Sequence, residues 1–233
     1  MCPCVVQYMS YHTSLTEKSL QSLVDADLLG GSESTRNATR ESLLCVITAF
    51  TLLQHQGDKM LPVDLNFFTN HLYTTLLPLS LDADVEYSHK SLRLPDPNLS
   101  HPAEKKINVA TEIEMLIRAL DALLFKQNQN MNPQRVAAFT KRLMTSTLHM
   151  PEKSALATVG MVVKTAMKYK GKVSGLWSSE ESVGDGVYRA DVDEPERSNP
   201  GAATVWEMVL LETHYSPVVR EAVVGLGKEF RSR

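Results

Sequence analysis

Apolar residues recur every three or four positions through most of the chain, which is the period of an amphipathic helix. Five stretches carry this pattern: residues 34–57, 62–77, 108–128, 132–150 and 151–171. Their inward stripes are predicted to contain Leu43, Ile47, Phe50, Leu65, Phe68, Leu72, Leu76, Ile113, Leu116, Ile117, Leu120, Leu124, Val136, Phe139, Leu143, Leu156, Val159, Val163 and Met167. No stretch shows the apolar–polar alternation of a strand. The pattern therefore predicts an all-α protein with at least six helices.

The helical period stops after residue 172. The acidic loop, residues 173–198, is rich in Gly, Ser and acidic side chains. It is long for a structureless connection inside a compact domain. We expect it to lie across helices, anchored by four large apolar or aromatic side chains: Leu176, Trp177, Val187 and Tyr188. The alternative is a flexible linker between helical units.

Two short helices are predicted after this loop. Asn199 before Pro200 is a typical helix start, and Ser216 before Pro217 repeats it. The first of these helices carries an apolar stripe that includes Trp206. We expect Trp206 to be buried between this helix and either the helix after Ser216 or the one that ends near Gly171.

Helices joined by such short connections pack against each other. The predicted architecture is an α-solenoid of the HEAT or armadillo kind, built from antiparallel helix pairs, although no strict sequence repeat is present. Residues 31–233 are expected to form this helical domain, and residues 1–30 a separate N-terminal segment. The residues expected in the core include Phe139, Leu143, Trp206, Leu210 and Tyr215.

Composition narrows the class of protein. The chain has 233 residues and a formal net charge of −3. No apolar run reaches the roughly 18 residues of a membrane span, so no membrane partner is expected. The three cysteines, Cys2, Cys4 and Cys45, form no zinc-ligand pattern and are expected to be reduced thiols.

The charges are unevenly distributed. Residues 101–172 carry 12 basic and five acidic side chains, whereas residues 173–198 carry two basic and seven acidic ones. Helical spacing puts Arg135, Arg142 and His149 on one face of their helix. It also puts Lys153, Lys164 and Lys168 on one side of the next helix. These rows could contact a nucleic-acid phosphate backbone; the alternatives are a solvated helix face or pairing with the acidic loop.

Enzyme signatures are missing from the sequence. There is no G-x-S-x-G, H-E-x-x-H or P-loop motif, and the seven histidines are dispersed. Gly225 and Gly227 have no predicted strand before them and do not form a dinucleotide-binding turn. No catalytic residue, cofactor or metal ligand is therefore expected.

Two stretches together resemble a known family. "RVAAFTKRLMTSTLHMPEKSALA" (135–157) is followed by "DVDEPERSNPGAATVWEMVLLETHYSPVVREA" (191–222). The ordered set A-F-x-K-R-L, H-x-P-E-K, an acidic loop, N-P-x-A-A-T-x-W-E and H-Y-x-P-V-V resembles the CCAAT-binding-factor (CBF) type domain of the nucleolar complex (Noc) proteins. The similarity covers roughly residues 40–230.

This resemblance implies a protein of the nucleus and nucleolus that assists assembly of the large ribosomal subunit and has no catalytic residues. The implied partners are the second nucleolar-complex protein, as a heterodimer, and pre-60S particles with their rRNA. For some family members the resemblance adds initiation of DNA replication and partners at replication origins. Because the family's proteins are longer, this chain is expected to be the C-terminal part of a longer protein. The alternative function is a nucleic-acid-binding module that uses the basic helix faces.

Overall fold

The computed structural model describes residues 32–54, 65–83, 85–86, 110–126, 131–177 and 185–231. Within these ranges the protein is all-α and contains no strand, so the predicted fold class is confirmed there. The expectations for residues 1–30, for Cys2 and Cys4, and for a helix end at Gly57 lie outside the described residues.

The elements follow one another with short connections from Pro133 to Leu176. The α-helices are α2 (Ser32–Gln54), α3 (Asn66–Ser80), α4 (Glu112–Asp121), α5 (Pro133–Thr147), α6 (Glu152–Lys168), α7 (Lys170–Val173), α8 (Glu207–Leu211) and α9 (Pro217–Arg231). A π-helical turn, η1 (Ala122–Lys126), continues α4, and three 3₁₀ turns are η2 (Ser174–Leu176), η3 (Pro195–Ser198) and η4 (Pro200–Ala202).

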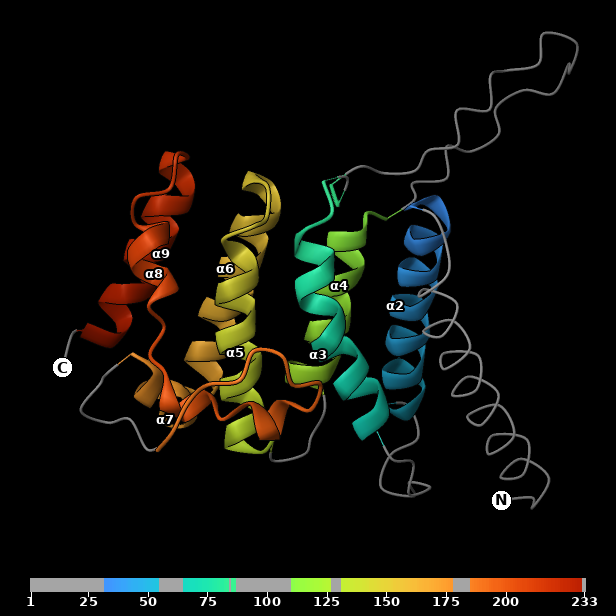
Figure 1. Cartoon of the computed structure of the whole chain (residues 1–233), viewed down its shortest axis with the longest axis horizontal. Helices are drawn as coiled ribbons and strands as arrows, with labels where there is room; N and C mark the ends of the chain where they lie inside the picture. The colour runs from blue at the N-terminus through green and yellow to red at the C-terminus, as the bar shows by residue number, and fades with distance from the viewer. Residues whose placement is uncertain are drawn as a thin grey trace, which may run out of the picture.

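The long helices lie side by side in a row, with α2 at one end and α9 at the other (Figure 1). Helix α5 lies in the middle and packs against α3 and α6, and α6 packs in turn against α9. At the other end α2 packs against α4. Other elements therefore surround α5, and its charged side chains contact these elements.

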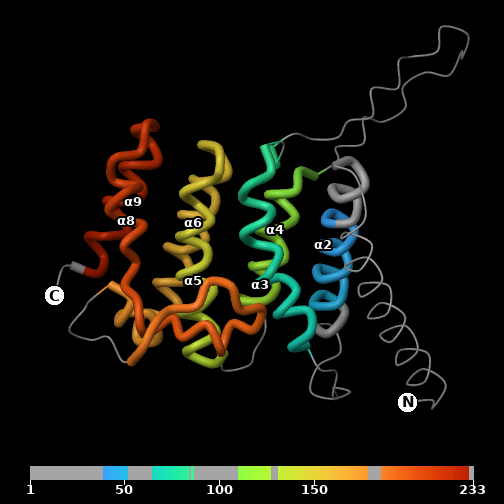
Figure 2. The backbone as a smooth tube through the Cα atoms, viewed as in Figure 1, coloured from blue at the N-terminus to red at the C-terminus, as the bar shows by residue number. Residues whose placement is uncertain are grey.

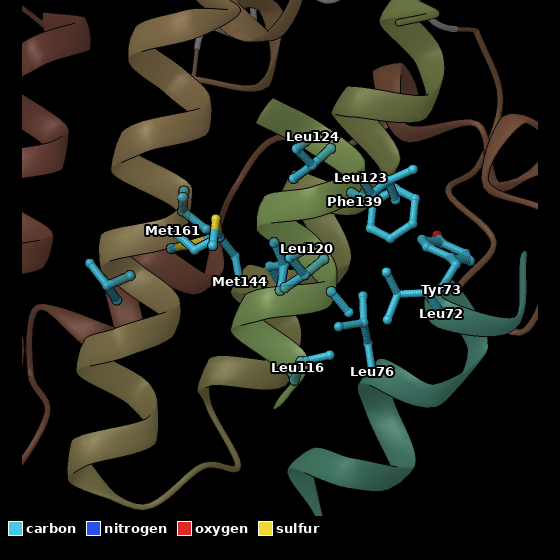
Figure 3. Close-up of a cluster of buried hydrophobic side chains, with 14 of the residues drawn as sticks. Leu72, Tyr73, Leu76, Leu116, Leu120, Leu123, Leu124, Phe139, Met144 and Met161 are labelled. Carbon is cyan, nitrogen blue, oxygen red and sulfur yellow. The ribbon is translucent and has the colours of Figure 1, made fainter. Parts of the chain in front are cut away.

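The core runs through this row as one cluster of apolar side chains. At its centre Tyr73 of α3 meets Phe139 of α5 edge to face, with ring centroids 5.2 Å apart (Figure 3). Phe139 and Leu143 are fully buried, as their stripe predicts. Edge-to-face pairs add to the free energy gained from burial, and this pair fixes α3 against α5.

Two helix starts follow directly from local sequence. Thr111 and Glu114 form a capping box at the start of α4, and Asn132 caps α5 ahead of Pro133. Such caps satisfy backbone N–H groups that the helix itself cannot pair. The single helix predicted over residues 108–128 is, within its described part, α4 followed by η1.

The buried face of α6 differs from the predicted stripe. Val159 is fully buried, but Leu156 is 37% and Met167 is 64% exposed. The buried positions include Ser154, Thr158 and Thr165. Each of these two threonine hydroxyls donates a hydrogen bond to the carbonyl four residues earlier. The hydroxyls are thereby satisfied, so α6 buries these small polar residues together with Val159, Met161 and Val162, and leaves Leu156 and Met167 outside.

Candidate functional site

Residues 185–206, which we call the strap, cross the ends of several helices before α8 begins. Figure 2 shows the strap in orange, running past the ends of α5 and α3. Its two halves are tied together where Arg189 N–H donates to Ser198 O at 2.8 Å and Asn199 Nδ2 donates to Asp185 O at 2.9 Å. Gly186 and Asn199 both have a left-handed backbone, with φ of 100° and 51°, so the strap turns sharply at these positions.

Glu207 follows the strap directly and is buried in the protein, where it contacts Lys141 of α5. Lys141 Nζ lies 2.7 Å from Glu207 Oε2 and also donates to Thr204 O at 2.6 Å. The other carboxylate oxygen accepts a hydrogen bond from the Thr145 hydroxyl at 2.6 Å. Both charged side chains are only 1% exposed. A buried pair with this many hydrogen bonds is costly to break on one side only.

Two aromatic rings lie over the Lys141 ammonium. Nζ is 5.2 Å from the centre of the Trp206 ring and 5.7 Å from that of Tyr188. Burial lowers the pKa of Lys141, and the hydrogen bond and charge of Glu207 oppose that change. Burial also raises the pKa of Tyr188, and the neighbouring Tyr73 adds to the rise. Together these groups join the strap to α5.

Arg142, the next residue on α5, is 6% exposed and binds carbonyl groups on two elements. Its Nη1 donates to Tyr73 O of α3 at 3.0 Å, and its Nη2 donates to Ala190 O and Val192 O of the strap. The guanidinium carbon lies 3.8 Å from the centre of the Tyr73 ring. Arg142 therefore links α3 to the strap.

Arg135, at the start of α5, makes a third attachment. Its Nε forms an ion pair with Glu196 of η3, and its Nη2 donates to Asn66 Oδ1 at 2.7 Å.

The acidic loop thus lies across helices within its described part, with Leu176 buried and Trp177 stacked on Phe230. Val187 is 77% exposed and was wrongly expected to be an anchor. Residues 178–184 of the loop lie outside the described part.

The predicted basic residues therefore do not form one common face. Arg135 and Arg142 bind the strap, whereas Lys153, Lys164 and Lys168 are exposed on α6. Lys153 is in the first turn of α6, whereas Lys164 and Lys168 lie about 16 Å and about 22 Å further along the helix at 1.5 Å per residue. His149 is exposed after the end of α5.

Lys164 and Lys168 do lie together, beside other lysines. We call Lys126, Lys164, Lys168 and Lys172 the lysine corner; these residues come from η1, α6 and α7. Lys170 contacts α9 instead, where its Nζ donates to Glu229 O at 3.2 Å. Lys164 and Lys168 both approach the Phe125 ring, at 4.2 Å and 5.2 Å. Asp121 pairs with Lys164 and Lys126. Spacing along the sequence could not reveal this group, because it joins three elements.

Helix α8 carries apolar residues on both sides. The side that is buried is opposite to the one that the apolar pattern predicted. Glu207, Met208 and Leu211 face inward. Trp206 is 51% and Leu210 is 52% exposed, and Val209 lies on the same outer side. The expectation that Trp206 and Leu210 belong to the core is therefore wrong. The Lys141–Glu207 pair turns Glu207 inward, and helical geometry then turns Trp206, Val209 and Leu210 outward.

The same region holds two further corrections. Tyr215 was expected in the core and is 71% exposed beside His214, between α8 and α9. The helix expected after Asn199 is a 3₁₀ turn, and α8 begins only at Glu207. The Asn199 side chain makes no capping hydrogen bond, and its amide nitrogen donates to Asp185 O.

Sequence reasoning did not find Lys141 and Glu207. A signal was present: Lys141 lies inside the run of apolar and small residues from Val136 to Met144, and Glu207 follows Trp206 in a second apolar run. A charged residue inside such a run is rarely buried unless it is paired. The partner's identity required the fold, because the two residues are 66 positions apart.

The described residues contain no group of three His, Cys, Asp or Glu side chains placed to hold a metal ion. None of the described helices has the length and apolar character needed to cross a membrane. The arrangement offers internal braces and two exposed surfaces, the outer side of α8 and the lysine corner. Within the described residues these features define an all-α class of protein whose helices are braced by buried charged side chains.

Comparison with known proteins gives the family. The model of the CBF/Mak21 family matches residues 42–223. The chain belongs to this family, as the ordered motifs predicted.

Three curated relatives share one description. "Nucleolar complex-associated protein 3" of Saccharomyces cerevisiae is 39% identical over 90% of this chain and 30% of its own length. Its Schizosaccharomyces pombe counterpart is 38% identical over 88% of this chain and 27% of its own length. The Homo sapiens "Nucleolar complex protein 3 homolog" is 34% identical over 81% of this chain and 20% of its own length.

The chain thus spans less than a third of the length of these relatives. Three further stretches of the sequence resemble the third nucleolar-complex protein: "HLYTTLLPLSLDADVE" (71–86), "KSLRLPDP" (90–97) and "GVYRADVDEPERSNP" (186–200). Of these, residue 84 and residues 90–97 lie outside the described residues. The names of the relatives support a location in the nucleus and nucleolus.

Proposed function

We propose that this chain is a non-catalytic helical scaffold that works in the nucleolus during maturation of the large ribosomal subunit. Its membership in the CBF/Mak21 family and its similarity to nucleolar complex protein 3 support this role. The proposed partners are the second nucleolar-complex protein and the pre-60S particle with its rRNA. Partners at replication origins, which the family resemblance implies, would use the same scaffold.

The row of helices is proposed to be a segment of an α-solenoid of the HEAT or armadillo kind. The packing of α5 against α6 and of α8 against α9 supports antiparallel pairs as its units. We take residues 31–233 as one domain built in this way. Such stacks offer long surfaces to large partners, because each unit contacts mainly its neighbours.

The scaffold proposal rests mainly on the apolar residues exposed on the outer side of α8. Trp206, Val209 and Leu210 lie at positions i, i+3 and i+4 and are 51%, 60% and 52% exposed. Exposed apolar residues that share one face mark sites of protein interaction. We propose that a helix of the second nucleolar-complex protein covers this face with its own apolar side.

Co-purification tests this contact. Leu210→Glu places a charge on the outer side of α8, where little folding energy is at stake, and is expected to abolish co-purification with the second nucleolar-complex protein. Leu81→Glu is the matched control, because Leu81 is 64% exposed after the end of α3. Retained binding by the Leu210 variant, or equal loss by both variants, would contradict the proposed contact.

The alternative was a nucleic-acid-binding module that uses one basic helix face. Two of the five residues expected to contact nucleic acid, Arg135 and Arg142, bind the strap instead. The scaffold is therefore the better supported function. The other three, Lys153, Lys164 and Lys168, remain exposed on α6.

A further inference from the structure

We propose that the lysine corner binds the sugar–phosphate backbone of RNA and does not read its bases. This inference rests on the proposed function and deepens it, since it names the molecule that one surface of the scaffold contacts. Its members are Lys126, Lys164, Lys168 and Lys172.

The ammonium groups of this corner are held next to one another by shared aromatic rings. Phe125 lies under Lys164 and Lys168, at 4.2 Å and 5.2 Å. Tyr169 lies 5.1 Å from Lys168 and 5.5 Å from Lys172. The row Lys164, Lys168, Lys172 is thus fixed in place before any ligand arrives, which lowers the entropy lost on binding.

Local pairing leaves this corner with excess positive charge. Asp121 supplies one carboxylate, which both Lys126 and Lys164 approach. Lys126 and Lys164 are 57% and 53% exposed, and exposed ion pairs of this kind contribute little to stability. Phosphate groups can therefore take the place of Asp121 at low cost.

A purely structural role accounts for part of the corner. Lys168 donates to Leu124 O and Phe125 O at the end of η1, and Lys172 donates to Met131 O. These bonds use neutral carbonyl acceptors, so the positive charges of both lysines remain. The carbonyl groups at helix ends need hydrogen-bond donors, but they do not need four cations in one place.

The kind of contact follows from the rings and from the side-chain type. Tyr169 is 9% exposed, and its hydroxyl donates to Leu124 O, so its ring is not free to stack on a base. Phe125 is covered by two lysines. What the corner presents is a set of ammonium groups, which bind phosphates as point charges without sequence preference.

An acidic protein segment is the less suitable occupant. Acidic motifs of proteins are recognised mainly by clusters of Arg, whose planar guanidinium binds a carboxylate through two hydrogen bonds. The cations of the corner are all lysines. A nucleic-acid strand suits such point charges, because its own charge repeats along its length.

The test uses the full chain and a fluorescent oligouridylate, with binding followed by anisotropy at several salt concentrations. The variant Lys164→Gln/Lys168→Gln/Lys172→Gln removes three charges and keeps side chains that can hydrogen-bond. The control, Lys153→Gln/Arg189→Gln/Lys228→Gln, removes three charges from exposed residues elsewhere. A third variant, with Arg at positions 164, 168 and 172, keeps the charge.

The corner variant is expected to bind about tenfold more weakly, and its salt slope should fall by about two units, since each single-strand phosphate contact contributes about 0.7. The control and the arginine variant should bind like the unchanged chain. A mixed-sequence RNA should bind as tightly as oligouridylate. If the corner variant fails to fold, Lys126→Gln/Lys164→Gln, which alters two exposed side chains, is expected to weaken binding in the same direction.

Three results would overturn the inference. The first is equal loss of binding by the corner and control variants, and the second is equal or tighter binding of oligoglutamate. The third is an unchanged chain that does not bind RNA. If that chain still co-purifies with the second nucleolar-complex protein, the proposed function stands and only the lysine corner loses its role.

Discussion

The ammonium of Lys141 lies 2.7 Å from the carboxylate of Glu207 inside the protein, where each side chain is 1% exposed. This pair joins α5 to the start of α8 across the end of the strap. It fixes which side of α8 faces inward, and therefore which apolar residues are left for a partner. The first prediction concerns the stability that this pair controls.

Glu207→Gln is expected to lower the free energy of unfolding by about 3–5 kcal/mol, because it leaves the buried Lys141 charge without its partner. Urea unfolding at neutral pH measures the change. Glu194→Gln is the control: Glu194 pairs with Arg197 at the surface, where such a pair contributes about 0–1 kcal/mol. The double variant Lys141→Met/Glu207→Leu should recover most of the loss, and a double variant less stable than Glu207→Gln would contradict this account.

The second prediction concerns Arg142 and the attachment of the strap. Arg142→Lys is expected to loosen the strap, because one ammonium cannot reach carbonyls on α3 and the strap together as the planar guanidinium does. Trypsin should then cleave faster after Arg189 and Arg197, which are exposed strap residues.

Cleavage after Lys228 of α9 provides the reference in the same digest. Its rate should not change, because Lys228 is remote from the strap in sequence and lies in a different element. Equal acceleration at all three sites would indicate global unfolding, and no acceleration at the strap would show that Arg142 does not hold it.

The third prediction compares two aromatic residues that the sequence pattern treats alike. Phe139→Ala is expected to cost about 3–5 kcal/mol of stability, because Phe139 is fully buried. Trp206→Ala should cost less than half as much, because Trp206 is 51% exposed. Thermal unfolding of both variants measures the difference. A Trp206 variant as unstable as the Phe139 variant would place the ring in the core after all.

The fourth prediction is a dependence of stability on pH above neutrality. Burial raises the pKa of Tyr188 above its usual value of 10.0, Tyr73 adds to the rise and Arg142 opposes it. The folded state therefore keeps the Tyr188 proton at a pH at which the unfolded state has lost it. This contribution to stability is complete below pH 10 and is lost as the pH rises from 10 towards the folded pKa.

Comparison of the unchanged chain with Tyr188→Phe isolates this contribution, since the variant removes the titrating hydroxyl and keeps the ring. The variant should lose stability less steeply above pH 10 in urea unfolding experiments. Below that pH, the lowered pKa of Lys141 makes stability rise with pH. Both proteins contain Lys141, so this rise cancels when their stabilities are compared. Parallel curves above pH 10 would show that Tyr188 titrates normally.

The sequence by itself determined the fold class, the family and much of the core. Helical periodicity places Phe139 and Leu143 on one stripe of α5, and both are fully buried. Asn132 with Pro133 starts α5 where local rules put it. These features depend on residues close together in the chain, so spacing and capping chemistry are enough to predict them.

Only the tertiary structure decided which side of α8 is buried and what the basic residues do. Helix α8 is apolar on both sides, so periodicity could not choose between Trp206 and Met208; the contact of Glu207 with Lys141, 66 residues away, made the choice. Likewise Arg142 and Lys168 are both cations on amphipathic helices. One is covered by the strap and the other is exposed, because burial depends on which elements pack nearby and not on the helix that carries the residue.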